Sequence, residues 1–169
     1  CGFGELGICC RNCLQGPCRI DPFGGKPDKG ICGARAYTIV ARNVIRLIAG
    51  GAAAHSGHGR HIAETVHQML EGRTPAYSIK DEEKLHRVAR HLGMETDGVD
   101  KEELAHKVVG SALEDFGRSD PVPLNFTTAN HTEQRVALWD RLGVLPTNID
   151  ESISDVIHRT TMGCDADPV

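Results

Sequence analysis

Apolar residues recur at helical spacing over most of the chain, while the alternating pattern of a strand is scarce. The clearest pattern lies between residues 34 and 48, where one side of a helix would carry a broad apolar stripe. The stripe consists of Tyr37, Val40, Ala41, Val44, Ile45 and Ile48. We expect an amphipathic helix that packs through this stripe and keeps its arginines largely off it. Residues 49–54 are all Gly or Ala, and we expect the helix to break or kink at Gly50 and Gly51.

Further helices are predicted downstream from apolar spacing together with start and stop signals. They run from a Ser78 cap to Leu92, from Asp100 to Gly117, from Thr132 to Leu142 and from Asp150 to Thr160, with a loop between Ser119 and Asn130. The predicted fold class is therefore all-α. A helical domain at residues 34–169 follows an irregular, Cys-rich segment at residues 1–33.

Composition narrows the functional classes. The 169 residues are 40% hydrophobic and 4% aromatic, and the formal net charge is −4. This mild charge gives no basic patch for binding nucleic acid. No apolar run is long enough to span a bilayer, and no signal peptide is visible.

The cysteines concentrate the candidate chemistry at the start of the chain. Six of the seven lie in residues 1–33, with the spacing C-x7-C-C-x2-C-x4-C-x13-C. They are Cys1, Cys9, Cys10, Cys13, Cys18 and Cys32. Thiolates crowded along a Gly-rich segment are typical ligands of iron-sulfur clusters or zinc. The segment is therefore predicted to bind a metal cofactor.

Six thiolates are too many for one cubane cluster, which usually takes four. Cys10, Cys13, Cys18 and Cys32 form a compact set, and Cys9 stands directly beside Cys10. In a helical turn, neighbouring side chains point about 100° apart, so Cys9 and Cys10 would reach different targets. Cys9 would then pair with Cys1, and a two-fold axis would bring two such pairs together to hold a second cluster.

Two alternatives remain at this point. Three disulfides would suit a small secreted domain, but this chain is much larger than such scaffolds. A structural zinc site on four of the cysteines is chemically possible, although the segment lacks a clean pair of C-x2-C knuckles.

The runs GICCRNCLQGPCRIDPFG and GICGARAYTIVARNVIRLIAGGAAAHSGHGRHIA carry a family resemblance. The chain resembles the N-terminal region of the catalytic subunit of anaerobic nickel-iron carbon monoxide dehydrogenase. The resemblance implies one internal 4Fe-4S cluster on Cys10, Cys13, Cys18 and Cys32. It also implies a 4Fe-4S cluster that bridges a homodimer, with Cys1 and Cys9 as ligands.

The resemblance implies an oxidoreductase that converts CO and water into CO2, two protons and two electrons. The ligands of the nickel-iron-sulfur cluster would lie in domains that follow this one, so we expect the chain to be a piece of a longer polypeptide. A ferredoxin-like electron acceptor and an acetyl-CoA synthase subunit are the implied partners. Oxygen-labile clusters and reduced thiols predict the cytoplasm of an anaerobic organism.

Histidines recur at a spacing of three, as His55, His58 and His61, and Glu64 takes the next position. Neighbours at this spacing on a helix are near enough to pass protons directly or through one water. The resemblance implies that these residues carry protons away from the CO-oxidising site. The residues alone favour ordinary surface or packing histidines, and a zinc site at His55 and His58 lacks a suitable third ligand.

Some positions carry less information. Arg11 and Arg19 flank predicted ligands and would either offset cluster charge or be ordinary solvated arginines. Cys164 has no companion at ligand spacing and is interpreted as a lone thiol. The second functional hypothesis is an iron-sulfur electron-transfer module without CO chemistry, either free-standing or part of a hybrid-cluster-type enzyme.

Overall fold

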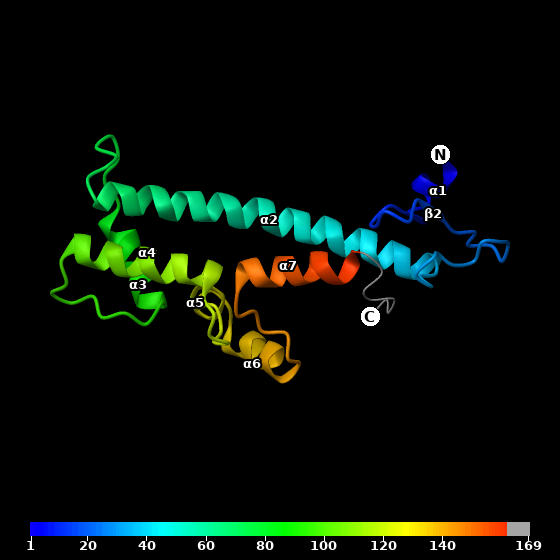
Figure 1. The fold of residues 1–169 in the computed structure, drawn as a ribbon. Helices are drawn as coiled ribbons and strands as arrows, with labels where there is room; N and C mark the ends of the chain where they lie inside the picture. The colour runs from blue at the N-terminus through cyan, green and yellow to red at the C-terminus, as the bar shows by residue number, and fades with distance from the viewer. Residues whose placement is uncertain (162–169) are drawn as a thin grey trace. The chain divides into compact units, whose positions relative to one another are not determined.

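The computed structural model describes residues 1–161 as helices joined by irregular connections, with one very small sheet (Figure 1). The predicted all-α class with an irregular Cys-rich start is confirmed. The described chain divides into two compact units, one made of residues 1–54 with residues 153–161 and one made of residues 55–152. Among the described residues, no helix combines the length and the apolar character needed to cross a membrane.

The Cys-rich segment begins with helix α1 (Gly2–Glu5) and contains strands β1 (Cys9–Cys10) and β2 (Cys18–Arg19). The two strands pair antiparallel, and each is only two residues long. A small core lies beneath them and consists of Cys10, Ile20, Ala34 and Ile39. The chain from residue 20 to residue 35 has no regular secondary structure, as predicted for the return loop.

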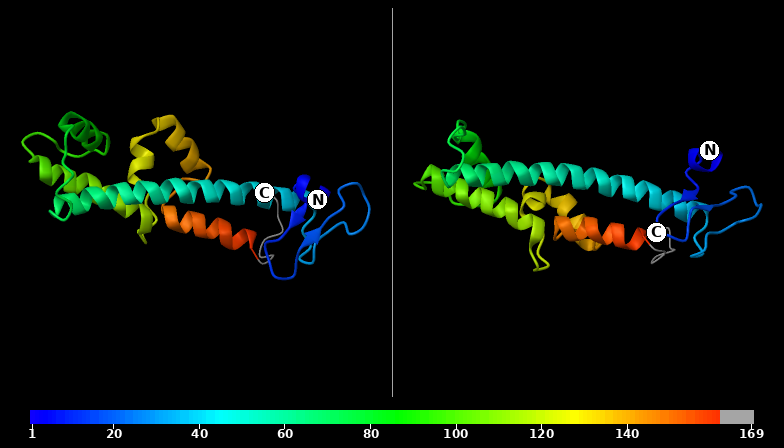
Figure 2. Two further views of the ribbon diagram at one scale, coloured as in Figure 1. Left: turned by 90° about the horizontal axis from the view of Figure 1, so that it is seen from above. Right: turned by 45° about the horizontal axis from the view of Figure 1, so that its top comes forward.

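Helix α2 (Ala36–Leu70) is continuous over 35 residues, as Figures 1 and 2 both show. The predicted break at Gly50 and Gly51 is wrong. Neither glycine has a positive φ, and each costs the helix only about 1 kcal/mol relative to Ala. The many good helix-forming residues on both sides are enough to carry the helix through this point.

The predicted packing face of α2 is also wrong. The apolar stripe is largely solvent-exposed in this chain, with Tyr37 59% and Ile48 64% accessible. The buried side is the opposite one and carries Thr38, Ile39, Arg42 and Ala49. Periodicity identified an apolar face correctly but could not tell which face the Cys-rich segment covers.

The second unit contains α3 (Glu82–His91), α4 (Lys101–Gly117), α5 (Asn125–Ala129) and α6 (Glu133–Arg141), and the last helix, α7 (Ile149–Thr160), begins in it. Asp100 and Thr132 cap α4 and α6 as predicted. The cap of α3 is Asp81 rather than Ser78, because the Asp81 carboxylate accepts the Lys84 N–H at 2.8 Å.

The short helix α5 lies within the predicted 119–130 loop. It begins where the buried Asp115 carboxylate accepts the N–H groups of Asn125, at 2.8 Å, and Phe126, at 3.0 Å. An acceptor supplied from α4 therefore satisfies the first donors of α5, as a local cap would. Neighbouring residues gave no signal of this helix because its cap comes from ten positions earlier in the chain.

Candidate metal centre

The two-strand ladder determines where three of the cysteines point. Cys10 pairs with Cys18, and Cys9 pairs with Arg19. Directly paired residues project on the same face of a sheet, whereas successive residues on one strand alternate between faces. Cys10 and Cys18 therefore share one face, and Cys9 points to the other. Cys9 and Cys10 do diverge, but because they lie on a strand and not in the helical turn that we expected.

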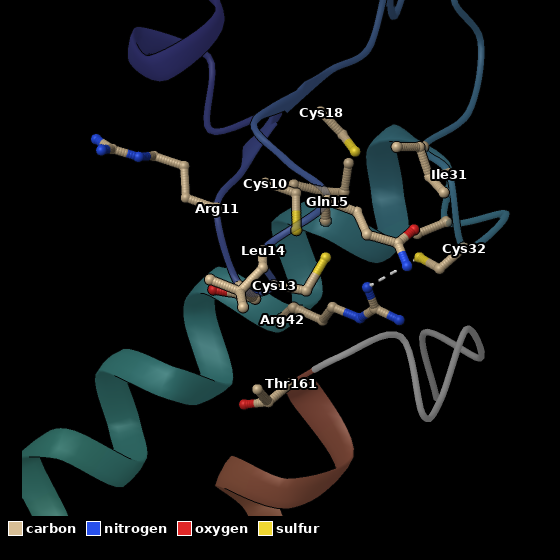
Figure 3. A pocket seen from close by; sticks show the side chains of 14 residues that line it. Cys10, Arg11, Cys13, Leu14, Gln15, Cys18, Ile31, Cys32, Arg42 and Thr161 are labelled. Atoms are coloured by element: carbon tan, nitrogen blue, oxygen red, sulfur yellow. Dashed lines mark hydrogen bonds between the residues drawn. The ribbon is translucent and has the colours of Figure 1, made fainter.

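A cavity of about 730 Å³ opens on the face that Cys10 and Cys18 share. Cys13 and Cys32 line it as well, so the structure brings together the four cysteines that spacing had grouped. Their sulfur atoms point toward a common space in Figure 3. The side chains come from β1, from the loop after it, from β2 and from the loop before α2.

Two glycines allow the backbone to fold closely around this cavity. A Cβ atom on Gly16 would lie 3.0 Å from the Cys10 carbonyl oxygen and 3.2 Å from the Cys18 nitrogen. A Cβ atom on Gly30 would lie 3.4 Å from the Cys18 sulfur. The Gly30 N–H also donates to the Ala34 carbonyl at 2.8 Å, which closes the turn that presents Cys32.

Arg42 is the functional neighbour that sequence reasoning missed. Its side chain reaches the cavity from α2, and its Nη1 donates to the Cys32 sulfur at 3.6 Å. Burial of the Cys32 thiol raises its pKa, but a backbone hydrogen bond from Ala34 and the Arg42 guanidinium lower it, and the net pKa lies below the usual cysteine value. By contrast, Arg11 and Arg19 are exposed, and Arg11 points away from the cavity in Figure 3.

The cavity lining has the chemistry that an iron-sulfur cluster requires. All six described cysteines are free thiols. The Asn12 amide also lines the cavity, and its Nδ2 is buried without a hydrogen-bond partner in the described structure. Buried donors normally have partners, so an acceptor held in the cavity would satisfy this one. Bound sulfide or thiolate sulfur is such an acceptor, and the residues therefore fit the cluster.

A single metal ion fits these residues less well. Within residues 1–161, no three His, Cys, Asp or Glu side chains converge on one ion-sized position. Tetrahedral zinc holds its thiolates at about 2.3 Å from one centre, which requires such convergence. A polynuclear cluster instead distributes its cysteines over several irons.

Cys1 and Cys9 lie apart from the four-cysteine cavity, whose lining includes neither. Cys1 is exposed at the N-terminus of α1, and Cys9 is half-buried. The segment between them is attached to α2 where the Asn43 amide donates to the Gly7 carbonyl at 2.9 Å. Exposed Phe3 and Leu6 lie between the two cysteines in the sequence.

The three-spaced histidines all lie on α2, and His55, His58 and His61 are exposed in this chain. The unbroken helix places them on successive turns, with a rise of about 4.5 Å per step. Glu64 continues the series and is exposed too. Cys164 lies outside the residues that the structure describes.

Comparisons with known proteins identify the family of the chain. Residues 8–169 match the Prismane/CO dehydrogenase family. The chain belongs to the Prismane/CO dehydrogenase family. Within this family, it is 54% identical over 170 residues to carbon monoxide dehydrogenase 1 of Carboxydothermus hydrogenoformans, covering 100% of this chain and 27% of that protein. The chain thus spans about a quarter of the length of such relatives.

Two solved structures of relatives in the family share the fold. A Ni-free carbon monoxide dehydrogenase from Thermococcus sp. AM4 matches with a TM-score of 0.94 and 48% identity, covering 99% of this chain and 26% of that one. A structure of acetyl-CoA synthase/carbon monoxide dehydrogenase matches with a TM-score of 0.93 and 46% identity, covering 99% and 25%. The latter is described as containing NiZn[Fe4S4] and NiNi[Fe4S4] clusters in its alpha subunits.

Proposed function

We propose that this chain forms the electron-relay region of an anaerobic carbon monoxide dehydrogenase. The enzyme would convert CO and water into CO2, two protons and two electrons. The observation that carries the proposal is the cavity lined by Cys10, Cys13, Cys18 and Cys32 in a member of the Prismane/CO dehydrogenase family. A 4Fe-4S cluster bound there would supply one-electron storage between the site of CO oxidation and an external acceptor.

The residues of this chain hold and shield that position. Cys10 and Cys18 are fixed by the strand pair, while Cys32 is fixed by the turn that begins at Gly30. Ile20 and Ile39 are 1% and 0% exposed and form an apolar floor beneath the ladder. An apolar floor on this side of the cavity lowers the local dielectric, so a nearby buried charge acts more strongly.

Cys1 and Cys9 would provide half of the ligands for a second cluster, completed by the same pair from another copy of the chain. Their separation from the four-cysteine cavity supports this division. Two thiolates leave a cubane half-ligated, and a two-fold axis is the simplest way to complete it. The chain would therefore function as a homodimer, with the shared cluster as the exit for electrons.

His55, His58 and His61 would carry protons along α2. Imidazole gains and loses a proton near physiological pH, and the continuous helix places these rings at regular steps. The ligands of the nickel-containing cluster would lie outside this chain. A ferredoxin-like protein would accept the electrons, an acetyl-CoA synthase subunit would be a further partner, and the protein would work in the cytoplasm of an anaerobe.

The test uses the complete gene product, prepared anaerobically. CO should reduce both clusters in the wild-type protein and pass electrons to a viologen dye. In Cys1→Ala protein, CO should still reduce the internal cluster, while dye reduction slows and the shared cluster's spectrum disappears. Cys164→Ala serves as the matched cysteine control and should behave as wild type.

The proposal is wrong if the wild-type protein oxidises no CO although it is fully loaded with metal. An iron-sulfur protein with that result would be an electron-transfer module of another enzyme. If Cys1→Ala leaves the clusters and dye reduction unchanged, the shared cluster is excluded and the internal cluster alone remains in the relay.

A further inference from the structure

We infer that Arg42 sets the reduction potential of the group held by the four cysteines, by donating a hydrogen bond and positive charge to the Cys32 sulfur. The inference rests on the proposed function, because it requires a cluster in the cavity. It goes beyond that proposal in naming a residue that is not a ligand. Arg42 would not bind the cluster itself but would act on it through the Cys32 sulfur, and it is therefore a positioning residue.

The geometry of Arg42 is specific. Its guanidinium reaches the cavity from α2 and is buried, with 5% of the residue exposed. Its Nη1 lies 3.6 Å from the Cys32 sulfur, and the dashed line in Figure 3 marks this contact. Arg42 lies three residues after Ile39 on the helix face that packs under the strand pair. The same packing that forms the core therefore fixes the guanidinium beside the thiol.

The charged residues around the cavity explain why the contact between Arg42 and Cys32 should influence the reduction potential. Among the described residues that line it, Arg11 and Arg42 are the ones with charged side chains, and no carboxylate is among them. Arg11 is exposed, so water and salt screen its charge. Arg42 is buried, where the effective dielectric is lower and a charge acts more strongly.

Reduction adds one electron to the cluster and so one negative charge close to Arg42. A fixed positive charge stabilises the reduced form more than the oxidised form, and an N–H donor to a ligand sulfur acts in the same direction.

The test is an EPR-monitored redox titration of the internal cluster in the complete gene product. Arg42→Met, which removes the charge and the donor, should shift the equilibrium toward the oxidised cluster by roughly tenfold, or about 59 mV toward lower potential for one electron. Arg42→Lys keeps the charge and should restore most of the shift. Arg11→Met removes an exposed arginine beside the ligand Cys10 and should leave the potential at the wild-type value.

A second measurement does not depend on assembly of the Arg42→Met protein. Wild-type protein labelled with ¹⁵N in its arginine guanidinium groups should show a hyperfine coupling to the reduced internal cluster. The coupling should persist in Arg11→Met and disappear in Arg42→Lys, which leaves no guanidinium at this position.

Three results would overturn the inference. The first is an Arg42→Met potential no lower than that of Arg11→Met with the cluster intact. The second is the absence of a nitrogen coupling in the labelled wild-type protein. The third is a wild-type protein without any iron-sulfur signal, which would also overturn the proposed function, whereas the first two leave that function standing.

Discussion

Gly16→Ala is expected to disturb the four-cysteine cavity through a single added methyl group. Gly16 does not adopt a positive φ, so alanine meets no left-handed strain there, and the expected effect comes from the contacts of the added methyl group. The new Cβ would lie 3.0 Å from the Cys10 carbonyl oxygen and 3.2 Å from the Cys18 nitrogen. Both atoms belong to the strand pair, so neither moves without changing how the two thiols face each other.

The magnitude follows from these distances. Comfortable contacts between heavy atoms begin at about 3.5 Å, so the ladder must open by roughly half an ångström. Overpacking of this kind costs typically about 1–3 kcal/mol. A site needs its ligands within about 0.5 Å of the productive geometry, so the same displacement should also reduce cluster occupancy.

The assay is iron and acid-labile sulfide per chain after anaerobic purification, together with the denaturant midpoint of the metal-free protein. Gly50→Ala is the matched control, because its Cβ meets no atom within 4 Å and it lies inside α2. That control should retain its iron and gain up to about 1 kcal/mol from helix propensity. The reasoning fails if Gly16→Ala keeps full occupancy and loses no stability.

Three further outcomes are expected. In metal-free protein the Cys32 thiol should be alkylated at a lower pH when folded than in denaturant, because its pKa lies below the usual value in the fold; equal pH profiles by mass spectrometry would contradict this. Asp115→Asn should cost about 2–4 kcal/mol in denaturant unfolding, since the buried carboxylate accepts two part-buried N–H groups, while the exposed Asp120→Asn should leave the denaturant midpoint nearly unchanged. His58→Gln should slow CO oxidation by the complete gene product without loss of iron, whereas His91→Gln on α3 should leave the rate of CO oxidation unchanged. Equal rates of CO oxidation in the His58→Gln and wild-type proteins would argue against proton transfer at His58.

The helices were largely predictable because their signals are local. The caps at Asp100 and Thr132 and the apolar spacing after them depend on residues within one or two turns. Cysteine spacing also grouped the four thiols that the structure places around one cavity. Ligands close in sequence on a flexible segment have few other places to converge.

What the sequence did not reveal depends on contacts between distant segments. Two-residue strands such as β1 are too short to show an alternating pattern. The divergence of Cys9 and Cys10 was therefore attributed to a helical turn instead of a strand. The covered face of α2 was misjudged because periodicity does not identify the covering partner. Arg42 looked like a polar residue outside the apolar stripe, and only the packing of α2 beneath the Cys-rich segment brings it to Cys32.

The most direct test of the central claim is the iron and acid-labile sulfide content of the anaerobic protein, compared between wild type and Cys13→Ser. If the four thiols hold a 4Fe-4S cluster, the wild type contains iron and sulfide in matching amounts, and Cys13→Ser loses most of one cluster's worth of both from each chain. A wild type that contains zinc without sulfide would contradict the account, as would an iron content that the substitution leaves unchanged.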